Sequence, residues 1–277
     1  MPTIFWGEKV PLTVNRIDRL FQNLSSRQSR AFVAYLVAGD PSPDLTPALV
    51  AALERAGTDV VELGVPFSDP LADGVVNQLG AQRALEAGTT VAGVFSIVEK
   101  IRASTQIPLV LFTYYNPVHH YGLDRFLADC ERTGVDGILL LDLPPEEAGP
   151  EWNAHPGVRR ISLIAPTTPE ERIGKITAAS SGFIYYVSRE GVTGMQTSVS
   201  SSMEERVALI RRHTFLPVCV GFGISNPEQA RQVARAAQGV VVGSAIVDRI
   251  ASWRNEADLA ARLEAFVQPL AAACHQP

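Results

Sequence analysis

Eight short runs of aliphatic and β-branched residues recur along the chain, and they constrain the fold more than any other feature. Most are continuously apolar rather than alternating, which is typical of parallel strands covered on both faces. The runs occupy residues 31–37, 59–65, 108–113, 136–142, 159–165, 182–187, 217–221 and 239–243. Helical segments separate them, and this alternation predicts a (β/α)8 TIM barrel. A doubly wound open sheet is the alternative, but it usually has fewer strands.

The helical segments carry their own start and stop signals. Asp44 is the predicted N-cap of a helix at 45–57, and Ser225 that of a helix at 225–239 with Pro227 in its first turn. A third helix is predicted at 124–134. Three further helices are predicted in addition to those of a minimal barrel. One precedes the first strand and closes the bottom of the barrel, and the other two follow strands two and eight. These extra helices are expected at 15–27, 77–87 and 244–251.

Length and composition fit a single barrel domain over residues 1–277, with residues 1–14 as an N-terminal extension. The chain is 46% hydrophobic and 19% charged, which supplies enough apolar material for one core. A net charge of −5 without a basic stripe argues against a nucleic-acid partner. The sequence has no run of membrane-spanning length and no secretory signal pattern. We therefore expect a cytoplasmic protein without a membrane partner.

Cysteine and histidine usage bears on metals and redox state. Three widely spaced cysteines without a CxxC pair support neither a zinc ribbon nor a disulfide framework, which fits a reduced cytoplasmic setting. The five histidines are either adjacent to one another or isolated, so no metal site is predicted. The residues concerned are Cys130, Cys219, Cys274, His119, His120, His155, His213 and His275.

The end of the second strand holds the first candidate catalytic group. Barrel enzymes place their sites at the C-terminal ends of the strands, so polar residues there become candidates. Glu62 interrupts an apolar strand, where a charge is costly unless paired or functional. If it shares a face with Val60, it points into the barrel mouth, and burial would raise its pKa into a range useful for proton transfer. A buried structural ion pair is the alternative.

The loop after this strand holds a second carboxylate, Asp73, which precedes Gly74 and could equally be a turn residue. Strands seven and eight end in glycines, at Gly221-Phe222-Gly223 and Gly243-Ser244, the latter before a short helix. Glycine lets backbone N–H groups approach a phosphate, and a helix N-terminus favours an anion. This pair of motifs predicts a phosphate site, with simple tight turns as the alternative.

Strand six runs into a stretch rich in Gly, Ser and Thr, from residue 188 to about 202. A long loop at a barrel mouth indicates a lid, and a plain surface loop is the alternative.

At these residues the chain resembles the tryptophan synthase α chain family. The strongest block is ELGVPFSDPLADG at 62–74. Further blocks keep family order over roughly residues 17–270: YLVAGDP at 35–41, TYYNPV at 113–118, GVDGILLLDLPPEE at 134–147, LIAPTTPEERI at 163–173, YYVSREGVTG at 185–194, GFGISNPEQA at 221–230 and VVGSAIV at 241–247.

The resemblance implies retro-aldol cleavage of indole-3-glycerol phosphate to indole and glyceraldehyde 3-phosphate. It makes Glu62 the acid/base that protonates C3 of the indole ring, and Asp73 the carboxylate that binds the indole N–H. Tyr185 would lie beside the glycerol chain of the substrate. Gly194, Gly223, Gly243 and Ser244 would form the phosphate cradle, and Thr193 would meet Asp73 when the lid closes. The resemblance also implies a β subunit in an α2β2 assembly, with no cofactor in this chain and pyridoxal phosphate in the β partner.

One departure from the family pattern follows Asp73. The family usually has Asp-Gly-Pro, two mostly apolar residues and Gln, whereas this chain has Val75-Val76-Asn77 before Gln78. Loss of the proline should loosen the loop, and Asn77 introduces an amide near the indole pocket. Three other functions remain open: a stand-alone lyase that releases indole, a catalytically silent regulatory subunit, and another phosphate-sugar barrel such as an epimerase.

Overall fold

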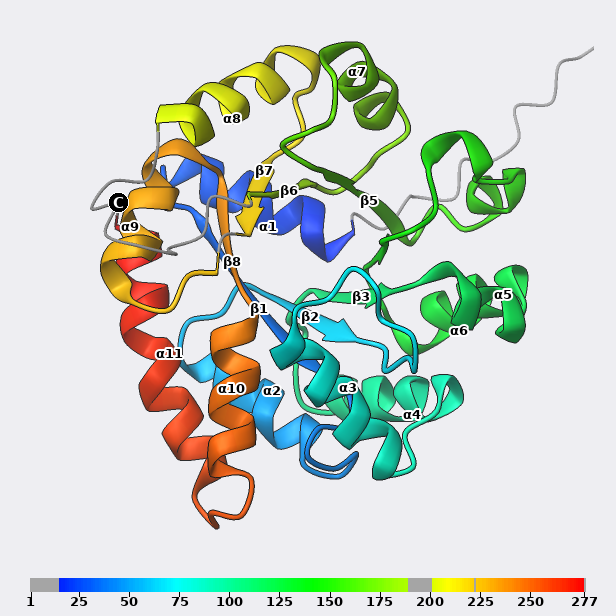
Figure 1. Ribbon diagram of the computed structural model, residues 1–277, viewed down its shortest axis with the longest axis vertical. Coiled ribbons are helices and arrows are strands. Elements are labelled where there is room, and N and C mark those ends of the chain that lie inside the picture. The colour runs from blue at the N-terminus through cyan, green and yellow to red at the C-terminus, as the bar shows by residue number, and fades with distance from the viewer. Residues whose placement is uncertain (1–14, 189–200, 222, 277) are drawn as a thin grey trace, which may run out of the picture.

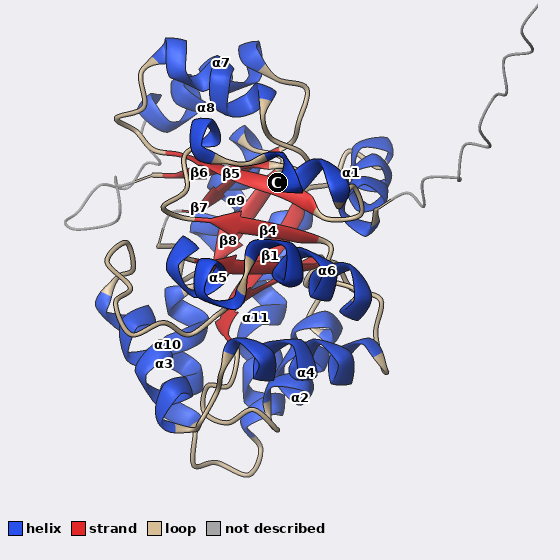
Figure 2. Ribbon diagram, turned by 90° about the vertical axis from the view of Figure 1, so that its right-hand side faces the viewer, coloured by secondary structure: helices blue, strands red, loops and turns tan. Residues whose placement is uncertain are grey.

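Eight parallel strands close into a barrel in chain order, β1 to β8, and helices surround it (Figures 1 and 2). The computed structural model describes residues 15–188, 201–221 and 223–276. Each strand lies within two residues of its predicted position, so the predicted TIM barrel is confirmed. The strands are β1 (Ala31–Val37), β2 (Val60–Gly64), β3 (Leu109–Thr113), β4 (Gly137–Leu140), β5 (Arg159–Ile164), β6 (Ile184–Val187), β7 (Val218–Gly221) and β8 (Gly239–Val242).

The helices follow the predicted alternation, with one exception between β4 and β5. The α-helices are α1 (Arg16–Ser26), α2 (Thr46–Arg55), α3 (Val75–Glu86), α4 (Val91–Arg102), α5 (Tyr115–Tyr121), α6 (Leu123–Thr133), α7 (Glu170–Ala178), α8 (Ser201–His213), α9 (Pro227–Ala236), α10 (Ser244–Trp253) and α11 (Leu259–His275). The connection between β4 and β5 instead holds two short 3-10 helices, η1 (Pro145–Glu147) and η2 (Pro150–Ala154). Prolines remove backbone donors and restrict the preceding residue, so this proline-rich segment does not form a longer helix.

The strands divide their side chains between two apolar layers because successive residues point to opposite faces. One layer fills the barrel interior and includes Val33, Val60 and Val241. The other lies between the strands and the surrounding helices and includes Val61 and Leu63. Glu62 therefore shares the inward face of Val60, as the sequence predicted.

Helix α1 closes the N-terminal end of the barrel. Its buried residues Ile17 and Phe21 pack into the inner layer, and the Phe21 ring lies 5.8 Å from the ring of Phe183, directly before β6. The predicted bottom-closing helix is thus confirmed, and the opposite end, where the strands terminate, is left for the site.

Both predicted N-caps are wrong. Asp44 forms an ion pair with Lys100 at 2.9 Å, and α2 begins after Leu45 without a side-chain cap. Helix α9 is capped by Asn226, whose side chain accepts from the Gln229 amide at 3.0 Å. Asn226 has the extended backbone that an N-cap needs directly before Pro227, so the cap lies one residue later than predicted.

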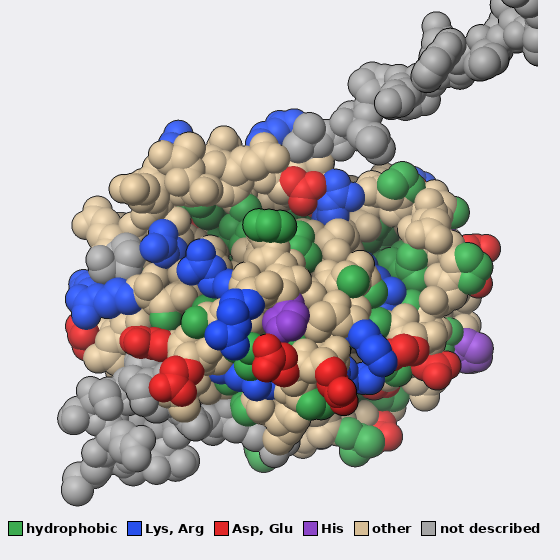
Figure 3. All heavy atoms as spheres, turned by 90° about the horizontal axis from the view of Figure 1, so that it is seen from above, with side chains coloured by type: hydrophobic (Ala, Val, Ile, Leu, Met, Phe, Trp, Pro, Cys, Tyr) green, Lys and Arg blue, Asp and Glu red, His purple; other side chains and the backbone are tan. Residues whose placement is uncertain are grey.

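The face over α7 and α8 mixes both signs of charge (Figure 3). Arg172 pairs with Glu146 and Arg212 with Glu170 across this surface. Among the described residues, no helix is both long and apolar enough to cross a membrane.

Candidate active site

Glu62 lies at the C-terminal end of β2 and is fully buried. Neither of its carboxyl oxygens has a hydrogen-bond partner among the described residues, so the alternative of a structural ion pair is not observed there. Desolvation by burial raises its pKa to about 8. At neutral pH the carboxyl group is therefore largely protonated and can donate a proton.

Two tyrosines accompany Glu62 inside the barrel mouth. Tyr35 on β1 is the register partner of Glu62, and Tyr185 extends from β6. Burial raises the pKa of both hydroxyls well above its usual value, and the Glu62 charge raises each further. Both phenols thus remain protonated around the carboxyl group, and sequence reasoning had identified Tyr185 but missed Tyr35.

Glycines on neighbouring strands make room for these two hydroxyls. A Cβ atom at Gly64 would lie 2.4 Å from the Tyr35 hydroxyl oxygen, and one at Gly221 would lie 2.5 Å from that of Tyr185. Real Cβ atoms do not approach so closely, so any side chain at either position would displace a tyrosine. Gly221, which the sequence associated with a phosphate turn, has this additional role.

Asp73 lies near the end of the loop after β2, and a tyrosine at the end of β3 binds its side chain. The Tyr114 hydroxyl donates to Asp73 Oδ2 at 2.8 Å and accepts from the Ala72 amide at 3.0 Å. Tyr114 is buried, and its ring packs against Phe67 with centroids 5.5 Å apart. Tyr114 follows β3 directly, so the search of strand ends that found Glu62 could also have found it.

The residues that depart from the family pattern lie in the first turn of α3. Gly74 is the N-cap, and Val75 is the first helical residue. Burial raises the pKa of Asp73, while the Tyr114 hydroxyl that donates to it and the nearby Asn77 amide lower it. Asn77 Oδ1 is buried and has no partner within the described chain. The substituted amide therefore acts on Asp73 itself.

A buried ion pair that the sequence did not reveal fixes α3. Asp40, after β1, is fully buried and accepts from the Arg83 guanidinium at 2.8 and 2.7 Å. At Gly80, a Cβ atom would lie 2.9 Å from Val247 of α10, so α3 and α10 approach closely there. The helix that follows Asp73 is thereby attached to the helix at the end of β8.

The ends of β7 and β8 lie side by side, since Gly221 and Val241 are register partners. Gly223 has φ +64, a left-handed conformation that glycine adopts without strain. Gly243 is the N-cap of α10 without a side-chain hydrogen bond, and Ser244 begins that helix. An uncapped helix N-terminus and backbone N–H groups at glycines are features that anion sites use.

Thr193 and Gly194 lie outside the described residues, as does most of the predicted lid. Within the described ranges, no group of three or more His, Cys, Asp or Glu side chains could hold a metal ion. The described carboxyl groups, tyrosines and helix end lie at the C-terminal ends of β1, β2, β3, β6, β7 and β8. The closed barrel with a buried carboxyl at its mouth defines the class: a (β/α)8-barrel protein equipped for acid–base chemistry.

Comparison with known proteins identifies the family within that class. The family model for the tryptophan synthase alpha chain matches residues 21–275. The tryptophan synthase alpha chain of Opitutus terrae is 55% identical over 240 residues, covering 86% of this chain and 90% of that protein. That of Geotalea uraniireducens is 49% identical over 262 residues, covering 94% and 97%. The crystal structure of the Legionella pneumophila α subunit superposes with a TM-score of 0.87 at 35% identity, covering 95% and 99%.

The chain belongs to the tryptophan synthase α chain family. It is accordingly a lyase of tryptophan biosynthesis, as the sequence resemblance implied. The stand-alone lyase, the silent subunit and the epimerase are not favoured by these relatives.

Proposed function

We propose that Glu62 and Asp73 together cleave indole-3-glycerol phosphate to indole and glyceraldehyde 3-phosphate. The observation that carries this proposal is the buried, unpaired Glu62 with a pKa raised to about 8. The protonated carboxyl gives its proton to C3 of the indole ring. The resulting carboxylate then accepts the proton of the glycerol hydroxyl as the carbon–carbon bond breaks, which releases the aldehyde and restores the aromatic ring.

Asp73 supplies a negative charge that stabilises the protonated, positively charged indole ring. Protonation at C3 places positive charge on the indole nitrogen, and a carboxylate that accepts its N–H stabilises that charge in the transition state. The Tyr114 hydroxyl and the Asn77 amide favour the ionised form of Asp73 against the opposing effect of burial. Tyr185 is proposed to lie beside the glycerol chain.

The phosphate is proposed to bind at the ends of β7 and β8, to backbone N–H groups around Gly223, Gly243 and Ser244. The uncapped N-terminus of α10 supports this placement. By the resemblance, Gly194 completes the cradle and Thr193 contacts Asp73 on closure.

The reaction needs no cofactor in this chain, because both proton transfers and the charge stabilisation are assigned to side chains. Pyridoxal phosphate is proposed to belong to the β partner alone. Full activity after exhaustive dialysis against a chelator is the expected result, and loss that added metal restores would contradict it.

A β subunit in an α2β2 assembly is the proposed partner, in the cytoplasm. An apolar strip on the rim supports this: Leu71 is 83% exposed, Val75 69% and Leu79 49%. Exposed apolar side chains that cluster around a functional loop mark interaction sites.

We also propose that the whole chain forms one domain with residues 1–14 as an extension, since the described helices pack on one barrel.

Single-turnover cleavage of indole-3-glycerol phosphate tests the catalytic assignment. Glu62→Gln keeps the shape of the side chain but cannot transfer the proton, so a loss of about 10²–10⁴-fold is expected. Asp73→Asn should also lose activity, whereas Asp69→Asn, an exposed position in the same loop, serves as the control. If the Gln variant stays within about twofold of wild type, Glu62 is not the acid/base.

A further inference from the structure

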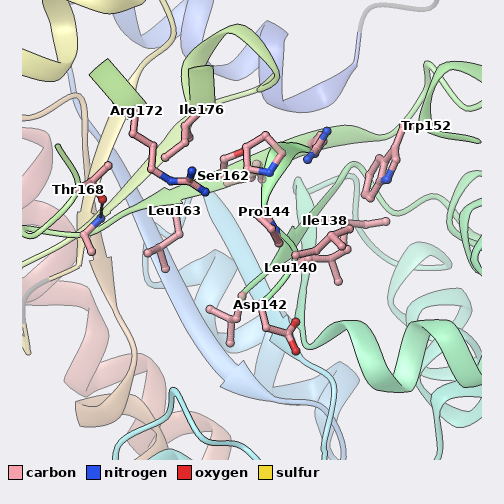
Figure 4. A pocket seen from close by; sticks show the side chains of 16 residues that line it. Ile138, Leu140, Asp142, Pro144, Trp152, Ser162, Leu163, Thr168, Arg172 and Ile176 are labelled. Carbon is pink, nitrogen blue, oxygen red and sulfur yellow. Dashed lines mark hydrogen bonds between the residues drawn. The ribbon is translucent and has the colours of Figure 1, made fainter. Parts of the chain in front are cut away.

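A second pocket lies beside β4 and β5, mostly on the outer side of the barrel, although Ile161 of the inner layer also lines it. None of its lining residues is assigned to the candidate active site. Its volume is about 310 Å³, at the lower end of the range for small-molecule sites. Its walls come from β4, β5, α7 and the connection with η1 and η2. In Figure 4, Arg172 and Trp152 lie toward opposite ends of the drawn side chains, with Ser162 and Pro144 between them.

The pocket exists because two features of the sequence coincide. The connection between β4 and β5 forms 3-10 turns instead of a covering α-helix. The outward face of β5 is also polar, since Arg160 and Ser162 point outward there, whereas the outward residues of β2 are the apolar Val61 and Leu63. A polar strand face below an incomplete helical layer leaves a cavity where other strands have packed apolar side chains.

Arg160 brings to this pocket a guanidinium that has no partner in the described chain. Among the described residues, no hydrogen bond or ion pair reaches its guanidinium, which lies 5.6 Å from the centre of the Trp152 ring. Burial lowers the pKa of Arg160, because the charged guanidinium loses contact with water. The negative charge of Glu146 raises the pKa of Arg160 in part. Glu146, however, already pairs with Arg172 at 3.1 Å. Asp142 also lines the pocket, so the two arginines face two carboxylates, and Arg160 is the arginine whose guanidinium has no partner in the described chain.

The remaining walls are largely apolar. Ile138, Leu140, Ile176 and the Trp152 ring line the pocket beside the charged group. The Trp152 Nε1 is a further donor without a partner in the described chain. A half-buried guanidinium is a fork of donors that matches the two oxygens of a carboxylate, and apolar walls match an apolar body.

We propose that this pocket binds a small monocarboxylate with a compact apolar body, whose carboxylate contacts Arg160 and whose body packs against Trp152 and Ile138. A single carboxylate matches the one arginine without a partner in the described chain, whereas a dianionic phosphate would bring a second negative charge into a pocket that Asp142 also lines. The site does not depend on the catalytic assignment, because no residue is shared.

Calorimetry of the full chain with phenylacetate tests the proposal, with phenylacetamide as the uncharged analogue and inorganic phosphate as the competing class. We expect saturable one-to-one binding of phenylacetate, and binding at least about tenfold weaker for the amide and for phosphate. Excess glycerol 3-phosphate should not displace phenylacetate. Displacement would place the ligand in the active site and overturn the proposal, as would equal binding of the amide or tighter binding of phosphate.

Variants locate the binding within the pocket. Arg160→Met keeps most of the stem and should weaken phenylacetate about tenfold or more, while Arg231→Met, on the exposed face of α9, should leave binding unchanged. Ser162→Leu keeps Arg160 but fills the space beside it, so this substitution should also abolish binding. Leucine is apolar and is tolerated on a buried strand face, so the variant is expected to fold. Unchanged affinity in a folded Arg160→Met or Ser162→Leu protein would rule out this pocket.

Discussion

At the scale of single residues, the site depends on a carboxyl group in a place that is unfavourable for charge. Glu62 has no ion pair or hydrogen bond in the described chain, and its two tyrosine neighbours stay protonated beside it. The same burial that keeps it protonated near neutral pH opposes its ionisation in the folded state. The acid/base role proposed for Glu62 and the folding stability therefore conflict at this position.

This conflict predicts a pH-dependent gain in stability for Glu62→Gln. The pKa of Glu62 is raised from 4.5 to about 8 on folding, so its contribution is favourable below the unfolded value and is lost as pH rises. Wild type should lose about 1.4 kcal/mol relative to the variant for each pH unit between these values. Denaturant unfolding of both proteins at pH 5 and pH 8 measures this difference. A constant difference across the range would show that burial does not raise the pKa.

Gly223 permits a test of the phosphate site through the backbone alone. No heavy atom lies within 4 Å of a Cβ built there, but φ is +64, which strains a β-branched residue. Gly223→Val should therefore weaken binding of glycerol 3-phosphate without unfolding the barrel. Gly223→Asn, which tolerates the left-handed region, should retain more affinity. Calorimetry that finds equal affinity for wild type and a folded Val variant would exclude this residue from the cradle.

At the scale of elements, sequence periodicity located all eight strands because parallel strands covered on both faces are continuous apolar runs. The inward direction of Glu62 followed from its parity with Val60. The contacts of Asp73 with Tyr114, and of Asp40 with Arg83, join residues about forty positions apart. Such pairs depend on which strand ends become neighbours, which no local pattern encodes.

Helix ends were harder to predict than strands because several polar residues compete for each cap. Both Ser225 and Asn226 can act as an N-cap, and the fixed backbone of Pro227 decides for the residue directly before it. The 3-10 connection after β4 was likewise not foreseen, although its prolines and glycines are plain in the sequence.

The start of α3 predicts a stabilising substitution. Val75 is the first helical residue, where proline loses no hydrogen bond, and the preceding Gly74 has φ −72 and ψ 160, which a following proline accepts. Val75→Pro should raise the free energy of unfolding by about 0.4–1 kcal/mol by restricting the unfolded chain. Leu79→Pro, one turn later and also exposed, should destabilise by about 3 kcal/mol. Equal effects in urea unfolding would contradict the placement of the helix start.

At the scale of the whole molecule, the elements that carry the two halves of the site are connected. Asp40 and Arg83 fix α3 to the end of β1, and Gly80 brings α3 against Val247 of α10. A partner that contacts the apolar strip on the rim would act on the helix that follows Asp73. It would favour the closed site in proportion to its preference for that state.

This connection predicts that a β subunit activates the chain and that Thr193 contributes to the effect. The isolated chain should be slow, since a misplacement of about 1 Å can cost 10²-fold. Thr193→Val removes the hydroxyl proposed to meet Asp73 and should reduce the activation. Indole formation by wild type and variant, with and without saturating β subunit, measures both effects. Equal activity in all four conditions would disprove the coupling, while equal activation of both proteins would exclude Thr193 alone.

The position of α1 also determines how the product can leave. Ile17 and Phe21 fill the lower opening of the barrel, and the inner apolar layer occupies the space between them and Glu62. If indole forms beside Glu62 as proposed, these described residues block the barrel axis, and the product would leave through the rim by which the substrate enters. That rim carries Leu71 and Val75, so the exit opens toward the surface proposed for the β subunit. If a partner binds there as proposed, substrate entry and indole release would both occur at the surface that it covers.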